Sequence, residues 1–522
     1  MPLPARLVLA ALAGVGAAAS FEPLHWVYLL PVTVAVLTAA CTGTRAGRGV
    51  LVGAVFGVAF MLALLPWLHV IGVAAWLVLA VVEGLYYGLL GWGTVLVTRL
   101  PWWPLWTACL WVGVELLRSS VPFGGFPWGR LAFAVTDTPL APLTGYVGAA
   151  GVTFAVALVG TSLAWAAYRV RTAPLRAVGA VAAVAALASL AAVFPVPAPA
   201  ADAPRVTVAA VQGNVPGEGL EAFAEQRVVL ENHVAATFEL AQRIKNRQAR
   251  LPDLMLWPEN SSDIDPYTDD SAHAAISAAV REVGAPLLMG AVVGDRAHDG
   301  WRNRAIVWSA RGRPVAHYDK RHPVPFGEYI PFRSFFAPRI PALSQIPSDM
   351  IPGHRPGVLQ VGPARVGVLM CFEVAYDGLL RDLVDEGARL VVVPTNNATY
   401  TGTGQIEQQF AISRLRAIET GRYVVVASTN GISGIIAPDG RVVARAPVRT
   451  QAVLEQPVTL SAAVTPAVRW GGRVEWALTV AGIVAVLAGL LLSGRARTRG
   501  TAAAPAGPDR RAERVEPAVR AS

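Results

Sequence analysis

Apolar residues gather into long runs in the first 194 positions of the chain and once more near its C-terminus. The runs cover residues 7–19, 24–40, 50–70, 71–97, 102–117, 145–168, 177–194 and 476–492. A helix of about 20 residues crosses the roughly 30 Å apolar core of a membrane. The pattern predicts a helical membrane domain of about seven spans over residues 1–197 and an eighth span at 474–494. The first run also fits a cleavable signal peptide ending near residues 17–20.

The pattern changes between the seventh and eighth runs. Short β-branched segments, typical of strands, cover 206–211, 254–257, 287–293, 305–308, 366–370, 390–393 and 423–427. Helical patterns cover 221–247, 271–283 and 405–420, and Pro438-Asp439-Gly440 marks a hairpin turn between 434–437 and 441–444. Strands that alternate with helices predict an α/β domain over residues 203–470, joined to the membrane part by a Pro/Ala linker at 198–204.

Charge separates the same two parts and orients them. The chain has 44 Lys+Arg and 35 Asp+Glu, a net charge of +9, but only 15% charged residues, against roughly 25% in soluble domains. Residues 1–194 hold nine Arg and no Lys. If the N-terminus is cytoplasmic, all of these arginines except Arg118 and Arg130 fall on the cytoplasmic side, as the positive-inside rule requires. We therefore expect a multi-pass protein of the cytoplasmic membrane, with residues 203–470 outside and an Ala/Pro/Arg-rich, disordered cytoplasmic tail at 495–522. The excess of basic residues reflects the membrane topology, so we expect no nucleic-acid partner.

The apolar part contains a few polar residues and cysteines that could have a chemical role. Glu83 and Glu115 lie within apolar runs, where a carboxylate marks either a functional site or a polar contact between helices, and both interpretations stay open. Cys41 and Cys109 lie in apolar stretches as well, and the sequence has no CxxC pair. We therefore expect neither a disulfide framework nor a metal site, and no cofactor.

Three residues of the soluble block stand out chemically, and two of them follow predicted strands. Cys371 follows an apolar strand, at the sheet edge where α/β proteins place their sites. Glu259 follows another strand in Trp257-Pro-Glu259. Lys320 is one of only two lysines, because the total of 44 comprises 42 Arg plus Lys245 and Lys320. A compact ammonium differs chemically from a guanidinium, so Lys320 is expected in a site rather than on a surface.

The order Glu259, Lys320, Cys371, at separations of 61 (259 to 320) and 51 (320 to 371), resembles the Glu-Lys-Cys triad of the nitrilase superfamily. Within it, roughly residues 1–495 resemble the apolipoprotein N-acyltransferases of bacterial envelopes. The motifs that carry the resemblance are Phe126-Pro-Trp128, Val211-Gln-Gly-Asn-Val-Pro216, Trp257-Pro-Glu259, Asn303, Tyr318-Asp-Lys320, Val324-Pro-Phe-Gly-Glu-Tyr-Ile-Pro331, Cys371-Phe-Glu373 and Pro394-Thr-Asn396. The resemblance implies an αββα sandwich beside the membrane helices.

The resemblance also implies a reaction in which an acyl chain passes from a phospholipid, through a thioester, to the α-amino group of the S-diacylglyceryl-cysteine of a lipoprotein. We assign Cys371 as nucleophile, Glu259 as general base and Lys320 as the cation that stabilises the oxyanion. Glu328, Glu373 and Asn303 are supporting candidates. The expected partners are the phospholipid donor, the modified apolipoprotein and the membrane, and the expected oligomeric state is a monomer.

A Pro-rich segment over 323–356 is predicted to form an apolar lid that shields the thioester from water. The candidates for lipid contact are Phe326, Tyr329, Phe335, Phe336 and Phe372. An ordinary surface loop is the alternative for this segment. Two rival functions also stay open at this point: a membrane-anchored nitrilase-like amidase acting on a small C–N substrate, and a non-enzymatic transporter or scaffold.

Overall fold

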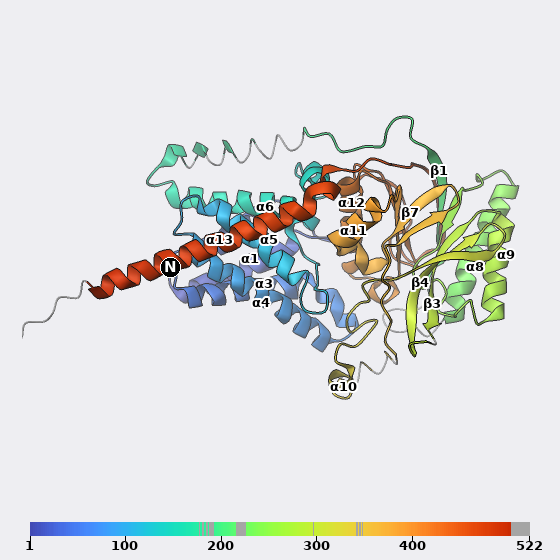
Figure 1. Cartoon of the computed structure of the whole chain (residues 1–522), viewed down its shortest axis with the longest axis horizontal. Helices are drawn as coiled ribbons and strands as arrows, with labels where there is room; N and C mark the ends of the chain where they lie inside the picture. Colours follow the sequence, from blue (N-terminus) through green and yellow to red (C-terminus); the bar gives the residue numbers. More distant parts are fainter. Residues whose placement is uncertain are drawn as a thin grey trace, which may run out of the picture.

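The structure is a computed structural model that describes residues 1–502, except 177, 180–181, 184–185, 187–192, 216–225, 296, 341–342, 344–345 and 347. Helices of the apolar part gather into one bundle beside a sheet-containing domain (Figure 1). They are α1 (Leu3–Ala19), α2 (Leu29–Cys41), α3 (Ala46–Leu64), α4 (Val73–Val97), α5 (Trp103–Arg118), α6 (Thr144–Arg169) and the C-terminal α13 (Pro466–Ala502). The last helix therefore returns to the bundle formed by the first six and packs against α5 and α6.

Length and composition identify the helices that could cross a membrane. Among the described residues, four helical segments are long and apolar enough: Ala46–Leu64, Val73–Val97, Ala141–Arg169 and Pro466–Ser493. The shorter α1 and α2 are apolar as well. Much of the predicted seventh span, 177–194, lies outside the described residues, so the predicted total of eight stays a prediction.

The final helix differs from its predicted bounds. It begins at Pro466 rather than near residue 474 and continues to Ala502. Residues 495–502, predicted as part of a disordered tail, are thus helical, because each new residue extends an existing ladder of i to i−4 hydrogen bonds at little cost. Residues 503–522 lie outside the described part of the chain.

The described residues of the soluble block form two six-stranded sheets. The first has the order β12-β1-β2-β3-β4-β5 and the second β11-β10-β9-β8-β7-β6. Strands of the first sheet are β1 (Arg205–Gln212), β2 (Leu254–Leu256), β3 (Leu287–Asp295), β4 (Gly300–Ser309), β5 (Arg313–Asp319) and β12 (Ala452–Thr459). Strands of the second are β6 (Val358–Val361), β7 (Ala364–Val368), β8 (Leu390–Thr395), β9 (Val424–Ser428), β10 (Gly434–Ile436) and β11 (Val442–Arg445).

Helices cover the outer face of each sheet. The helices α8 (Gln226–Lys245) and α9 (Asp270–Val283) lie against the first sheet, and α11 (Asp377–Asp385) and α12 (Gln405–Thr420) lie between the second sheet and the membrane bundle (Figure 1). A core of buried side chains from both sheets, including Val208, Leu288, Val368 and Val392, joins their inner faces. These layers confirm the expected α/β architecture with two sheets.

Several elements escape the sequence pattern. The strands β5, β6 and β12 and the helices α10 (Arg333–Phe336) and α11 were not predicted. Along β5 and β12 most residues are exposed or only partly buried. Strands of this kind show little alternation of apolar and polar residues, because backbone pairing with a neighbouring strand holds them in place rather than burial of one face.

Both carboxylates in the apolar part have arginine partners. Glu83 Oε2 lies 3.2 Å from Arg118 Nη1. Glu115 lies 3.5 Å from Arg130 Nε and accepts hydrogen bonds from Leu131 N and Thr153 Oγ1, each at 2.8 Å. These buried contacts favour the interpretation of both residues as polar contacts within the bundle.

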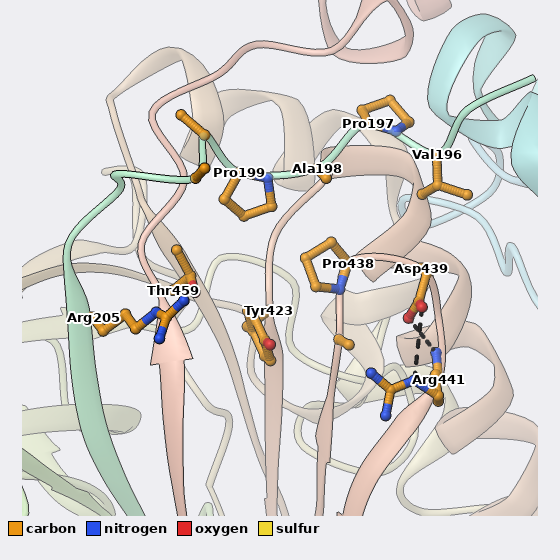
Figure 2. A pocket seen from close by; sticks show the side chains of 13 residues that line it. Val196, Pro197, Ala198, Pro199, Arg205, Tyr423, Pro438, Asp439, Arg441 and Thr459 are labelled. Atoms are coloured by element: carbon orange, nitrogen blue, oxygen red, sulfur yellow. Dashed lines mark hydrogen bonds and ion pairs between the residues drawn. The ribbon is translucent and has the colours of Figure 1, made fainter.

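The linker that enters the soluble block closes a surface pocket. A pocket of about 290 Å³ lies beneath residues 196–201 and is lined on its other side by Arg205, Tyr423 and the hairpin turn at Pro438 (Figure 2). None of the three triad candidates lines it. The chemistry predicted from the sequence therefore lies elsewhere.

Candidate active site

Three strand ends place the triad candidates. Glu259 follows β2 after Trp257 and Pro258, and Lys320 follows β5 directly. Both strands belong to the first sheet, whereas Cys371 follows β7 of the second sheet and opens the short helix η6 (Cys371–Ala375). The Cys371 backbone has φ +52°, in the sparsely populated left-handed region. Strain of this kind is commonly stored at functional sites.

Lys320 is buried between two carboxylates. Its Nζ lies 2.9 Å from Glu259 Oε1 and 3.0 Å from Glu328 Oε2, and the side chain is 2% exposed. Burial opposes the charged ammonium, but the negative charges of Glu259 and Glu328 outweigh it and raise the pKa of Lys320 well above its usual value. Lys320 is therefore an obligate cation in this site.

An amide connects the same two carboxylates. Asn303 Nδ2 donates to Glu259 Oε1 at 2.8 Å and to Glu328 Oε1 at 2.6 Å. The Lys320 backbone N–H donates to the Asn303 carbonyl at 2.9 Å. The supporting candidates Asn303 and Glu328 thus fix the position of the Lys320 ammonium from two directions.

Glu259 sits in a tight backbone environment. Its second oxygen, Oε2, accepts a hydrogen bond from the Asn396 backbone N–H at 3.0 Å. A Cβ on Gly290 of β3 would lie 2.5 Å from the Glu259 Cα, so only glycine lets the strand pass this close. Both carboxylate oxygens therefore have fixed partners, which orients the group.

Cys371 is a protonated thiol at rest. Burial and the charge of Glu259 raise the pKa of the thiol to about 12, against the opposing effect of Lys320. Its Sγ lies 3.8 Å from Gln409 Oε1 on α12. Gln409 Nε2 in turn donates to Thr395 Oγ1, at the end of β8. The protonated thiol is therefore the favoured form of Cys371 in this setting.

Glu373 connects the nucleophile turn to the lysine strand. It is fully buried and accepts hydrogen bonds from the backbone N–H of Met370 at 2.8 Å and of Arg321 at 2.8 Å. Tyr318 Oη, on β5, donates to the same carboxylate at 2.8 Å. Because Met370 precedes Cys371 and Arg321 follows Lys320, Glu373 fixes the spacing between nucleophile and cation.

The membrane part packs directly onto the nucleophile turn. Phe372 stacks on Trp128 with ring centroids 5.9 Å apart and on Phe126 at 5.5 Å. The Trp128 indole N–H donates to Gln408 Oε1 on α12 at 2.7 Å. The Phe-Pro-Trp motif of the first domain is thus part of the wall around the candidate site.

Aromatic residues of the predicted lid cluster with one another. Phe326 and Phe336 lie 5.5 Å apart between ring centroids, and Phe335 and Phe336 lie 5.0 Å apart. Phe335 is 53% exposed, and Tyr329 is partly buried. The short helix α10 that carries Phe335 and Phe336 protrudes from the soluble domain (Figure 1). The cluster is compatible with lipid contact, which stays a prediction.

Sequence reasoning missed the residues that support the site from behind. Gln409 and Thr395 contact one another beneath Cys371, and Asn397 Nδ2 donates to Gln409 Oε1 at 3.1 Å. Thr395 belongs to the Pro394-Thr-Asn396 motif, which contributes to the family resemblance but was given no functional role from the sequence. Gln409 gave none, because a glutamine in a helix is usually exposed. Among the described residues, no group of three His, Cys, Asp or Glu side chains could bind a metal.

Comparison with known proteins defines the class first. Residues 207–465 match the carbon-nitrogen hydrolase family model, and residues 13–162 match that of the apolipoprotein N-acyltransferase N-terminal domain. The chain is thus a nitrilase-superfamily protein with an added apolar domain.

Relatives identify the family within this class. The chain is 41% identical to the apolipoprotein N-acyltransferase of Mycolicibacterium smegmatis over 91% of this chain and 84% of that protein. It is 30% identical to that of Geobacter metallireducens over 92% and 95%. The chain belongs to the apolipoprotein N-acyltransferase family. Among solved structures, an amidase from Nesterenkonia sp. matches with a TM-score of 0.34 and 19% identity over 49% of this chain and 90% of that one.

Proposed function

We propose that this chain transfers an acyl chain from a membrane phospholipid to the α-amino group of the N-terminal S-diacylglyceryl-cysteine of lipoproteins, with Cys371 carrying the acyl group between the two. The observation that carries the proposal is the buried Lys320, paired with Glu259 and Glu328 beside a protonated Cys371. This arrangement suits acyl transfer in two steps, each with its own leaving group.

In the first step Cys371 Sγ attacks the ester carbonyl of the phospholipid. The thiol proton passes to Glu259, and the carbonyl oxygen becomes an oxyanion. Collapse breaks the ester C–O bond, and Glu259 returns the proton to the departing lysophospholipid oxygen. The products are a thioester on Cys371 and a lysophospholipid with a free hydroxyl, so Glu259 ends the step ionised as it began.

Lys320 stabilises the oxyanion. An ammonium has three N–H donors, and two of them point to Glu259 and Glu328. The third is available to the developing negative charge. One such donor typically lowers the barrier by about 2.7 to 4 kcal/mol. Asn303, Glu328 and Glu373 act as positioning residues, because they contact the triad rather than the acyl group.

In the second step the neutral amine of the acceptor attacks the thioester. Glu259 takes a proton from the attacking nitrogen and delivers it to the departing Cys371 sulfur. The products are an amide and the regenerated thiol. Water would compete for the thioester, so the Phe326, Phe335 and Phe336 cluster is assigned to the lid that excludes it and contacts lipid, with Tyr329 and Phe372 lining the same region.

We propose the membrane topology from the apolar runs and from the distribution of arginines. Residues 1–197 and 474–494 span the cytoplasmic membrane, 203–470 face the extracytoplasmic side, and the tail from 495 is cytoplasmic. The chain acts as a monomer without a cofactor. A protease applied to intact spheroplasts should leave a C-terminal tag whole and should cut it once the membrane is opened; cutting in intact spheroplasts would contradict this topology.

Product analysis tests the reaction. Purified enzyme, phospholipid vesicles and a synthetic S-diacylglyceryl-cysteinyl peptide should yield N-acylated peptide and lysophospholipid in equal amounts by mass spectrometry. The Cys371→Ala variant should yield neither. Free fatty acid without N-acylated peptide would contradict the proposal, since it would make water the acceptor.

A further inference from the structure

Cys371 lies on a cluster of buried polar side chains that no step of the proposed reaction uses. The cluster comes from the end of β8, the turn after it and the helix α12, and its members, between 1% and 4% exposed, are Thr395, Asn397, Gln405 and Gln409. Cys371 Sγ lies 3.8 Å from Gln409 Oε1, with the thiol as a weak donor. On this side the nucleophile faces an oxygen acceptor, which favours the protonated thiol over the thiolate.

A backbone amide fixes the direction of this contact. The Gly431 N–H donates to Ser428 Oγ at 2.9 Å, so the serine O–H is left to donate to Asn397 Oδ1, 3.1 Å away. Asn397 then turns its Nδ2 toward Gln409 Oε1, at 3.1 Å. Gln405 Nε2 donates to the same oxygen at 2.8 Å. A reversed Gln409 amide would place its own N–H groups against both donors, so the oxygen is held beside the sulfur.

The other end of the Gln409 amide sets the direction of a second contact. Gln409 Nε2 donates to Thr395 Oγ1, which leaves the threonine O–H free to donate elsewhere. Thr395 forms a hydrogen bond with the Cys371 sulfur that favours the thiolate, against the larger opposing effect of burial. The sulfur thus lies between an acceptor suited to its protonated form and a donor suited to its ionised form, and one amide orients both.

These two neutral contacts complement the charges around the nucleophile. The charged groups that act on the thiol are Glu259, Lys320 and Glu328. We propose that Gln409 and Thr395 are further catalytic residues that bind the Cys371 sulfur in alternation. The Gln409 oxygen holds the S–H form at rest, and the Thr395 hydroxyl donates to the thiolate once the proton has left. The inference rests on the proposed acyltransferase function and adds two groups that contact its reacting atom.

The protons balance without ionisation of either residue. As Glu259 takes the thiol proton, the S–H contact with Gln409 is lost. The sulfur, now negative, is repelled by the amide oxygen and attracted by the Thr395 O–H. It then attacks the ester carbonyl and forms the C–S bond of the thioester. When the amine later displaces the sulfur, Glu259 delivers the amine proton to it, and the contact with Gln409 forms again.

Opposite effects on thiol alkylation test the pair without any phospholipid. Iodoacetamide modification of Cys371, located by peptide mapping, is measured between pH 8 and pH 10. Gln409→Leu removes the acceptor and keeps the Thr395 hydroxyl, so modification should become about threefold faster or more at each pH. Thr395→Val removes the donor and keeps the shape, so modification should become about threefold slower or more. Thr395→Ser should restore it to within about twofold of wild type, because it keeps the hydroxyl.

A charged variant connects the contact to acyl transfer. Gln409→Glu keeps the oxygen beside the sulfur and adds a negative charge, and its second oxygen takes up the Thr395 O–H. Modification of Cys371 should therefore slow about tenfold or more. Acylation of Cys371 by phospholipid should slow with it, while the KM for phospholipid stays within about twofold. Gln242→Glu, at an exposed glutamine of α8, is the matched control and should change none of these quantities.

The direction of the changes separates this role from damage to the fold. A disturbed fold would expose Cys371 and speed its modification in every variant. Modification that changes in the same direction in Gln409→Leu and Thr395→Val, or that stays within twofold of wild type in either, would overturn the inference. If one of these two fails to fold, Gln409→Glu decides, because unchanged modification there contradicts the inference. If wild type forms no thioester, the proposed function fails, while the alkylation series still decides the two contacts.

Discussion

Two buried cations invite comparison. Lys320, 2% exposed, lies between Glu259 and Glu328 in the candidate active site. Arg130, 3% exposed, lies at the junction of the two domains, 2.7 Å from Asp377 and 2.9 Å from Glu475. Both cations are buried among carboxylates. One is an arginine, as are 42 of the 44 basic residues of the chain, and the other is one of the two lysines.

The difference lies in what each cation leaves free. Arg130 also faces Glu115, so its planar guanidinium joins α5, α11 and α13 in one fixed arrangement. Arg416 reinforces that arrangement from α12, because it pairs with Asp377 and donates to the Val374 carbonyl at 2.8 Å. Lys320 is a compact point charge on a flexible stem, so its ammonium can turn toward a further acceptor. Arginine suits the rigid junction, and lysine suits a charge that must meet a transient oxyanion.

The largest expected effect comes from exchanging the cation in the site. Lys320→Arg keeps the charge but places a broad, planar group between Glu259 and Glu328. We expect Cys371 acylation by phospholipid to fall about 10² to 10³-fold, as for the loss of an oxyanion donor, and Lys320→Ala to be at least as slow. Single-turnover acylation measures this. A Lys320→Arg enzyme within tenfold of wild type would show that charge alone suffices.

The second effect concerns the junction and should appear in stability. Arg130→Met removes the cation that faces Glu475 and Glu115 and leaves Asp377 with Arg416 alone, which we expect to cost about 3 to 5 kcal/mol in the free energy of unfolding. Arg130→Lys should cost less. Thermal unfolding in detergent, followed by acylation assays on the folded fraction, separates stability from chemistry. If Arg130→Met were as stable as wild type, the structural role assigned to Arg130, in contrast to the catalytic role of Lys320, would be wrong.

The third effect tests the connection between the nucleophile and the cation. Glu373→Gln keeps the shape of the side chain but replaces one acceptor oxygen with a donor, which then faces either the Met370 N–H or the N–H groups of Arg321 and His322. An unsatisfied buried group costs about 1 to 3 kcal/mol. We expect acylation to slow about tenfold while the KM for phospholipid stays within twofold. A change confined to KM would argue for a binding role instead.

The fourth effect concerns the thiol. Because the folded pKa of Cys371 is raised to about 12, the thiolate fraction below that pH is small and grows tenfold per pH unit. Iodoacetamide modification of Cys371 should rise accordingly between pH 7 and pH 10, without a plateau. In Lys320→Met the opposing positive charge is lost, so modification should be several times slower at each pH. A plateau below pH 9 would indicate a preformed thiolate.

The smallest effect comes from the other lysine. Lys245 pairs with Glu282 on the surface, where the two side chains are 55% and 34% exposed. Exposed pairs contribute about 0 to 1 kcal/mol, so Lys245→Ala should leave acylation within twofold of wild type and stability nearly unchanged. A strong loss of acylation in Lys245→Ala would contradict the view that the effect of Lys320 comes from its position in the candidate site.

Much of the fold could be predicted from local sequence patterns. The helix at 405–420 was predicted with the bounds that α12 has, because its ends coincide with Gly residues and its length exceeds that of a strand. Glu259 and Cys371 could be selected as candidates because each follows an apolar strand, whereas Lys320 was selected because the chain has only two lysines. In contrast, β12 pairs with β1 across more than 200 positions of sequence, and its partly buried residues lack a clear alternation.

Contacts between distant segments could not be predicted. Arg130 and Glu475 meet across 345 positions, and neither residue differs locally from one that faces solvent or the lipid surface. The same holds for Gln409, whose surroundings arise only when α12 packs beside Cys371. Sequence patterns predict strand ends well, whereas a polar side chain reveals its role only through its tertiary neighbours.

We propose that Cys371 carries the acyl group while Lys320 and Glu259 make its transfer possible. The most direct measurement is to incubate the enzyme with acyl-labelled phospholipid without acceptor, trap the protein, and locate the label by peptide mapping before and after treatment with neutral hydroxylamine. The account predicts one hydroxylamine-labile acyl group on the peptide that contains Cys371, absent in Cys371→Ala and strongly reduced in Lys320→Arg. Label that resists hydroxylamine, or that persists in Cys371→Ala, would contradict it.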